Sequence, residues 1–302
     1  MKYGVLVFSY KNFEKTKRQF ETEGMYAINL GDYMQTLAVR RMYREMGIPD
    51  EDVLEIDRDS ITEYAGEPVI LPMSACCYKW CFPLPENIWP VFIGFQAKED
   101  VIQLHQDYFR KFSFMGCRDI HTASLFEKYG IAATVTGCVT MTFRPREKVP
   151  TVAKVLVVYG SGAGAFPAEI FPYIPKKLLP CVELVYQRKV VHSHPLDRAQ
   201  MIEAELHARW LLEDYRRRAT LVISPLHHVA VPCMSAGIPV ILARKKYSIR
   251  FSYLETLMKV YGTADFAAID WSGVLVNVDS IRENWIAQFR RCAEVLCMER
   301  AG

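Results

Sequence analysis

The stretch that decides the fold runs from residue 221 to residue 243 and reads LVISPLHHVAVPCMSAGIPVILA. Its first four residues are apolar apart from the last and predict a short buried strand. Residues 230–236 predict a short helix that opens near Pro232 and ends where Gly237 follows. Residues 239–243 predict a second strand. Because a strand, a helix and a strand in succession are typical of a parallel sheet, this stretch indicates an α/β fold.

The same alternation extends over the rest of the chain. Residues 3–9 and 153–159 are short runs rich in Val and Leu, and each is expected to open one α/β lobe. Residues 145–150 are charged and bounded by prolines, a composition typical of a linker between domains. The predicted divisions are residues 1–148 for the first lobe, 149–302 for the second, and 280–298 for a terminal helix that crosses back to the first lobe.

Other elements are expected between these landmarks. After the first strand we expect a long loop, and then a helix that starts at Gly31 and Asp32 and ends at Gly47. Further predicted strands lie at residues 53–56, 69–71, 114–117, 132–135, 181–186 and 189–191, and further predicted helices at residues 99–112, 122–129 and 196–217.

Composition excludes several classes of protein. The chain has 302 residues, of which 51% are hydrophobic and 24% charged, as expected for a folded globular protein. Its net charge of +3 is mild, and basic and acidic residues are interspersed, so a nucleic-acid partner is not expected. No apolar run is long enough to cross a bilayer, and the N-terminus shows no signal peptide, so we expect a cytoplasmic protein. The nine cysteines, an odd number, are expected to be reduced thiols rather than disulfides or metal ligands.

Candidate functional residues lie in the loops that follow the predicted strands. His227 and His228 lie where a strand joins a helix, a position at which a histidine can bind an anion or act as an acid or base; backbone hydrogen bonding is the alternative reading. Residues 160–164, with three glycines, could approach a phosphate closely, or could serve as a hinge. Asp32, at a helix start, has the plainer reading of an N-cap.

Three groups of residues in a fixed order carry a resemblance to a known family. The first group is Gly31, Asp32, Gln35 and Leu37; the second is Arg118, Asp119, Thr122, Gly130, Val135 to Cys138 and Thr140; the third is Ser224, Leu226, His227, Pro232, Gly237 and Pro239. Together they resemble the polysaccharide pyruvyltransferase family, from about residue 25 to about residue 255. The resemblance implies a glycosyltransferase-B-like fold, in which two Rossmann-like lobes face each other across a cleft.

The resemblance also implies a reaction. The donor would be phosphoenolpyruvate, whose pyruvyl unit is transferred to two hydroxyls of a sugar as a cyclic ketal, with no metal or other cofactor. The acceptor sugar would belong to a surface polysaccharide or to its lipid-linked or nucleotide-linked precursor. We therefore expect phosphoenolpyruvate and this sugar as partners, together with peripheral contact at the inner face of a membrane. An aromatic stretch, residues 80–90, is the candidate for that contact, with burial as the alternative.

Site residues follow from the resemblance position by position. It makes His227 and Arg118 the catalytic pair, with Asp32 and Gln35 lining the cleft. Further substrate-binding candidates follow from their position in loops: Ser224, Leu226 and His228 after the strand at residue 221, Arg250 and Arg198 in second-lobe loops, and Gly162 in the glycine-rich turn. One departure stands out, because relatives carry an arginine where this chain has Pro225, which has no side-chain donor. Either another cation substitutes, with Arg198, Arg250 and Lys245 as candidates, or the activity has changed. His192 and His194 could also face the cleft or play a structural part.

Two other functions remain open from the sequence. One is a glycosyltransferase that uses a nucleotide sugar on the same fold. The other is a carbohydrate-binding relative without catalysis, for which Pro225 is the motivating feature.

Overall fold

A computed structural model describes residues 1–301, with side chains up to residue 299. The first lobe is built on a parallel sheet in the order β3-β1-β4-β5. Its strands are β1 (Lys2–Val7), β3 (Val53–Asp57), β4 (Val69–Pro72) and β5 (Ile88–Val91). Beyond β5, the short strands β6 (Gly116–Cys117) and β7 (Thr134–Val135) form a second parallel pair.

The second lobe has a five-stranded parallel sheet in the order β13-β12-β11-β8-β9. Its strands are β8 (Val155–Tyr159), β9 (Val182–Tyr186), β11 (Leu221–Ser224), β12 (Val240–Ala243) and β13 (Val260–Tyr261). Along β8, Val155 and Val157 belong to one apolar cluster, while Leu156 and Val158 belong to another. The sheet is therefore buried on both faces at β8, which explains why residues 155–158 are all apolar, whereas the edge strand β9 is partly exposed and contains Glu183.

Helix α2 (Leu30–Glu45) lies between the two sheets and packs against β1, α6 (Arg198–Arg218) and α7 (His227–Ser235). Most of its residues are buried, as expected of a helix enclosed on several sides. Its N-cap is Asn29, whose side chain accepts a hydrogen bond from the backbone N–H of Gly31. The reading of Asp32 as the N-cap is therefore wrong, and its carboxylate lies within the first turn.

The predicted long loop before α2 is also wrong. It contains α1 (Glu14–Glu23) and β2 (Tyr26–Asn29), and β2 pairs antiparallel with β10 (Arg188–Val191) from the second half of the chain. Helix α1 buries none of its residues, so its sequence carries no apolar period that could have revealed it. The β2–β10 pair ties the two halves of the chain together.

Two predictions about the helices after β5 also need correction. The helix expected over residues 99–112 is divided at His105 into α3 (Glu99–Leu104) and α4 (Gln106–Phe109). Helix α5 (Ile120–Lys128) is capped by Asp119, whose carboxylate accepts from both the backbone N–H and the hydroxyl of Thr122, each at 2.9 Å. The helix predicted over residues 122–129 therefore begins two residues earlier, and its cap is Asp119.

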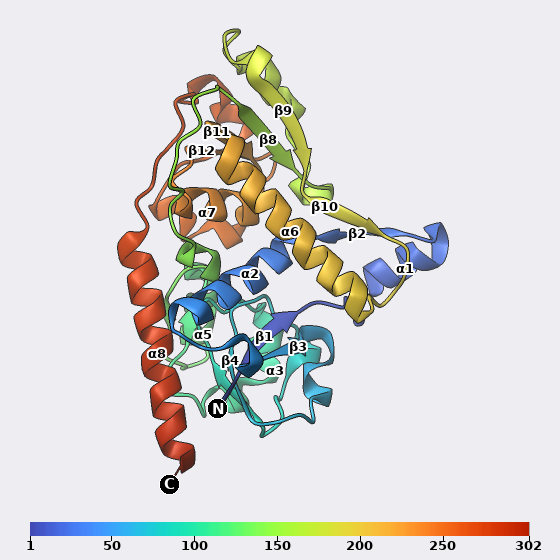
Figure 1. Cartoon of the computed structure of the whole chain (residues 1–302), viewed down its shortest axis with the longest axis vertical. Helices are drawn as coiled ribbons and strands as arrows, with labels where there is room; N and C mark the ends of the chain where they lie inside the picture. Colours follow the sequence, from blue (N-terminus) through green and yellow to red (C-terminus); the bar gives the residue numbers. More distant parts are fainter. Residues whose placement is uncertain (302) are drawn as a thin grey trace.

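The C-terminal helix α8 (Asp279–Ala301) leaves the second lobe and runs along the first (Figure 1). It packs on β4 and β5. Trp285 and Phe289 of α8 are fully buried, and the ring of Phe289 contacts Tyr43 of α2, with centroids 5.9 Å apart. The predicted fold class, two lobes with parallel sheets and a terminal helix that crosses back, is confirmed.

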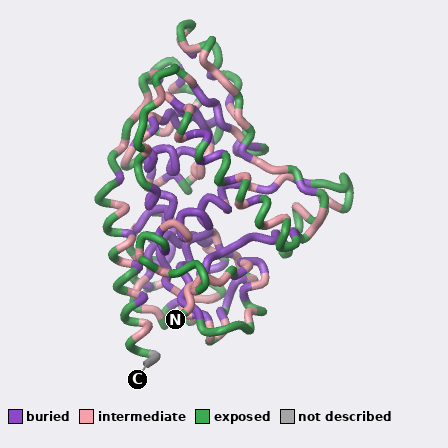
Figure 2. The backbone as a smooth tube through the Cα atoms, viewed as in Figure 1, coloured by how far each residue is buried: buried purple, intermediate pink, exposed green. Residues whose placement is uncertain are grey.

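Buried backbone is concentrated in the two sheets and α2, whereas α8 and the end that carries α1 face solvent (Figure 2). The aromatic stretch after residue 79 packs largely inward: Phe82 is buried against Phe109, and Trp80 stacks on Tyr78 with ring centroids 4.7 Å apart. Among the described residues, no helix combines the length and apolar character needed to span a bilayer.

Candidate active site

The site forms where α7 begins, directly after β11. The side chain of Ser224 donates to the carbonyl of Val158 at 2.7 Å and accepts from the backbone N–H of Leu226 at 3.1 Å, which fixes the turn. Ser224 is fully buried, and its hydroxyl stabilises this turn. Helix α7 begins at His227, so the prediction that it opens near Pro232 is wrong.

Pro232 lies inside α7, and the local structure adapts to it. Proline has no N–H, so the carbonyl of His228 four residues earlier lacks its helical partner. The backbone is non-helical at His228, and its carbonyl accepts instead from the side chain of Gln187 at 3.1 Å. Both histidines therefore lie in the first turn of α7, held on a kinked but satisfied backbone.

Helix α2 supplies the second wall of the site. A Cβ atom at Gly31 would lie 2.5 Å from the Cβ atom of His228, so only glycine allows this close approach. Gln35 lies one turn further on the same helix face. It is buried, and its side-chain oxygen has no partner among the described residues. Asp32 is half-buried and accepts from the Tyr10 hydroxyl at 3.0 Å.

Arg118 enters from the first lobe at the end of β6. It is buried, and one terminal nitrogen donates to the side-chain oxygen of Gln96 at 2.7 Å. Its Nε has no hydrogen-bond partner among the described residues, and neither does Oδ2 of Asp119, with which that Nε forms an ion pair at 3.9 Å. The guanidinium of Arg118 is therefore held in place by Gln96 and keeps N–H groups that make no hydrogen bond to any described residue.

Two more arginines come from the second lobe after β12. Arg244 is nearly buried, and its guanidinium lies over the ring of Phe251, 4.4 Å from the centroid. Arg250 donates to the sulfur of Cys76 at 3.4 Å, so it reaches across to the first lobe. Phe251 also contacts the ring of His227, with centroids 5.8 Å apart.

The surroundings keep both histidines neutral. Burial lowers the pKa of His227 well below its usual value, and the positive charges of Arg118, Arg250 and Arg244 add to the effect. Burial, with the charges of Arg118 and Arg250, lowers the pKa of His228 to about 3. Nδ1 of His227 is buried without a partner among the described residues. At neutral pH the site therefore presents an uncharged imidazole amid fixed cations, an arrangement that attracts an anion and can accept a proton.

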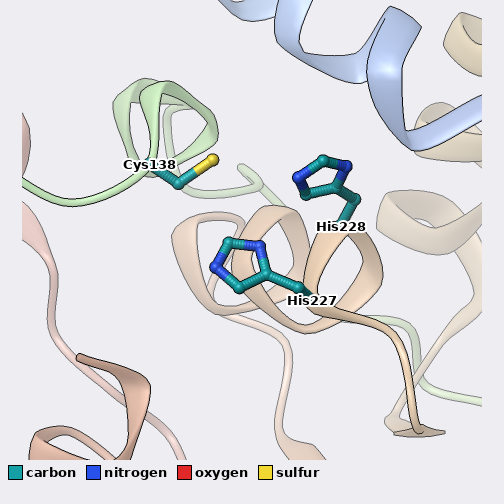
Figure 3. A group of neighbouring side chains, drawn as sticks. All are labelled: Cys138, His227 and His228. Atoms are coloured by element: carbon teal, nitrogen blue, oxygen red, sulfur yellow. The ribbon is translucent and has the colours of Figure 1, made fainter. Parts of the chain in front are cut away.

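The same histidines could also hold a metal ion. The sulfur of Cys138 and one ring nitrogen each of His227 and His228 lie within 4.8 Å of one another, and the three side chains point into a common space (Figure 3). A thiolate and two imidazoles suit Zn²⁺. The nearby charges of Arg118 and Arg250 oppose a cation, however, and burial raises the pKa of the Cys138 thiol, which disfavours the thiolate. The electrostatics therefore favour an anion in this space.

The structure places the remaining candidates at varying distances from this site. Leu226 packs under the glycine loop, since a Cβ at Gly164 would lie 2.5 Å from its side chain. Gly162 is exposed on that loop with a φ of +59°. Arg198 is not brought to the site, because it lies at the exposed start of α6, 3.6 Å from Glu55. Lys245 is exposed and pairs with Glu169 at 2.6 Å.

The two other candidate histidines, His192 and His194, lie just after β10. His194 shares a hydrogen bond with the carbonyl of Tyr10 at 2.9 Å and contacts the ring of Tyr26, so it joins the two halves of the chain. His192 is exposed.

Sequence reasoning missed four residues of the site: Gln96, Cys76, Asp119 as a site carboxylate, and Arg244. Gln96 and Cys76 belong to short connections without any motif. Arg244 lies in a basic run that reads as a solvated strand end, and only its buried contacts distinguish it from Lys245.

Comparison with known proteins adds a family. A family model described as polysaccharide pyruvyl transferase matches residues 29–243, more than half of the chain. No curated protein sequence gives a significant match.

Solved structures give only remote likenesses. An uncharacterized protein from Klebsiella pneumoniae has 12% identity and a TM-score of 0.45, over 84% of this chain and 88% of that one. A trehalose 6-phosphate synthase from Burkholderia multivorans has 11% identity and a TM-score of 0.31, over 89% and 74%. A UDP-forming trehalose-phosphate synthase from Burkholderia xenovorans has 10% identity and a TM-score of 0.28, over 86% of this chain and 75% of that one. At these TM-scores the likenesses carry no argument.

Proposed function

The chain belongs to the polysaccharide pyruvyl transferase family, as its motifs predicted, and from this premise we propose that it transfers the pyruvyl unit of phosphoenolpyruvate to two hydroxyls of a sugar, forming a cyclic ketal. The observation that carries the proposal is the neutral His227 amid Arg118, Arg244 and Arg250. A donor with both a phosphate and a carboxylate needs several cations, and arginine binds both groups well.

The proposed reaction balances without a cofactor. The terminal carbon of phosphoenolpyruvate gains one proton, and the first sugar hydroxyl attacks the adjacent carbon. The bond to phosphate then breaks, and the second hydroxyl closes the ring. The two hydroxyls lose one proton each, while the terminal carbon and the leaving phosphate gain one each, so the reaction consumes no proton overall.

His227 is suited to act as the general base in this reaction. Its lowered pKa leaves the imidazole uncharged before the donor binds, so it can accept the proton of an attacking hydroxyl. The donor's negative charge then stabilises the imidazolium that forms, and this imidazolium can pass its proton to the departing phosphate. Arg118 binds the donor from the first lobe, where its Nε has no hydrogen-bond partner among the described residues. Asp32 and Gln35 line the acceptor side on α2.

The test measures phosphate release from phosphoenolpyruvate in the presence of candidate sugars, both lipid-linked and nucleotide-linked. The product is examined by NMR, because a ketal carries a methyl group, whereas an enol ether keeps its vinyl CH₂. We expect His227→Ala to lower acceptor-dependent release by about 100-fold or more, the usual range for loss of a general base. His192→Ala, at an exposed histidine, is the matched control.

Three results would count against the proposal. Turnover that survives His227→Ala removes His227 from the mechanism. A thermal shift with a nucleoside diphosphate and none with phosphoenolpyruvate favours a glycosyltransferase. Sugar binding without turnover of any donor favours a binding protein.

A further inference from the structure

Pro225 poses a chemical problem that the structure can address. The resemblance to the polysaccharide pyruvyltransferase family implies an arginine at residue 225, where this chain has a proline. A proline side chain has no N–H that could bind the anionic groups of phosphoenolpyruvate. If the proposed reaction occurs, a cation from elsewhere in the chain must lie near residue 225.

The three cations favoured by the sequence do not fill this role. Arg198 lies at the start of α6 beside Glu55, and Lys245 faces solvent in a pair with Glu169. Arg250 contributes to the site, but its guanidinium contacts Cys76 on the first-lobe side.

Arg244 is in contact with residue 225 itself. One of its terminal nitrogens donates to the carbonyl of Pro225, the other donates to the carbonyl of Ala163 at 3.3 Å, and Nε donates to the carbonyl of Lys246 at 3.1 Å. The guanidinium thus joins three loops that leave the same edge of the sheet, after β8, β11 and β12. Ligands of parallel α/β sheets gather at this edge.

The contacts leave Arg244 able to bind an anion. A guanidinium has five N–H donors, and three serve the backbone carbonyls, so each terminal nitrogen keeps one N–H. The carbonyls and the ring of Phe251 hold the plane of the group in place. A cation held in this way loses little conformational freedom when it binds a carboxylate or a phosphate.

We propose that Arg244 replaces the motif arginine missing at Pro225 and binds an anionic group of the donor. This inference rests on the proposed function. Arg244 is then a residue that binds phosphoenolpyruvate. The positive charge that Pro225 lacks is supplied beside it by Arg244.

The experiment measures phosphoenolpyruvate binding by calorimetry in four chains: wild type, Arg244→Ala, Arg244→Lys, and Arg244→Ala combined with Pro225→Arg. We expect Arg244→Ala to weaken binding by about 10- to 100-fold, as for loss of a charged hydrogen bond. Arg244→Lys should keep part of the affinity. Pro225→Arg should restore binding in the Arg244→Ala background to within about threefold, since the new guanidinium would occupy the vacated neighbouring space. Lys245→Ala is the matched control and should bind as the wild type does.

The rescue separates binding from structural support, because an arginine at 225 does not rebuild the contacts of Arg244 with the three carbonyls. Inorganic phosphate and pyruvate are titrated separately, and the one whose binding Arg244→Ala weakens identifies the group that Arg244 holds. Wild-type affinity in Arg244→Ala, or a loss that Pro225→Arg does not reverse, overturns the inference. If the wild type itself neither binds nor turns over phosphoenolpyruvate, the proposed function fails, and Arg244 is not the cause.

Discussion

Acidification should weaken the packing of α2 against α7, because His228 is half-buried there as a neutral imidazole. Its Cβ lies where Gly31 allows the two helices to approach, so a proton on the ring would place a charge inside the contact. Arg118 and Arg250 would repel that charge.

The size of the effect follows from the two pKa values. In the unfolded chain a histidine titrates near pH 6.5, whereas the pKa of His228 in the folded chain is about 3. Between these values the unfolded state binds more protons, so stability is lost as the pH falls through this window. From pH 7.5 to pH 5 the loss from His228 is about 2 kcal/mol, at about 1.4 kcal/mol per pH unit below 6.5. His227, whose pKa is also lowered, adds to the loss in the same direction.

The assay is thermal and urea unfolding at pH 7.5, 6 and 5, for the wild type and for His228→Asn. Asparagine cannot take up the proton, so the variant should lose about 2 kcal/mol less than the wild type over this range. For a chain of this size the difference corresponds to about 3 °C in Tm. His192→Asn, at an exposed histidine, is the control and should keep the wild-type pH dependence.

The reasoning fails if His228→Asn loses stability with acid as steeply as the wild type. That result would mean that His228 is already protonated, or well solvated, at the interface. A shallower loss in His192→Asn than in the wild type would place a sensitive histidine elsewhere.

Three further predictions follow from the packing and charge of the site. Gly31→Ala should destabilise the chain by about 1–3 kcal/mol, measured by urea unfolding, because the added Cβ clashes with His228; a gain in stability, as expected for alanine in an unobstructed helix, would contradict the close approach. Dialysis against a chelator should leave acceptor-dependent phosphate release unchanged. If release were lost instead, and Zn²⁺ restored it in the wild type but not in Cys138→Ser, the Cys138 cluster would be a metal centre. Trp285→Ala should cost about 3–5 kcal/mol in unfolding free energy, since the ring is fully buried between α8 and the first lobe, and a cost below about 1 kcal/mol would show that α8 is not anchored there.

The sequence by itself determined the fold class and predicted residues at the centre of the candidate site. Continuous apolar runs such as residues 155–158 predict strands buried on both faces, and this pattern depends only on neighbouring residues. The position of His227 between a strand and a helix made it a candidate, and the resemblance to the family added Arg118. In contrast, α1 and the β2–β10 pair were missed, because a solvated helix has no apolar period and strand pairing across about 160 residues leaves no local trace.

Only the tertiary structure decided which cation lies at Pro225. Arg244, Lys245 and Lys246 form one basic run in the sequence, and nothing local distinguishes them. The fold buries Arg244 against three carbonyls and leaves Lys245 in solvent beside Glu169. Charge can be read from a sequence, but burial and direction depend on loops brought together from three separate strands.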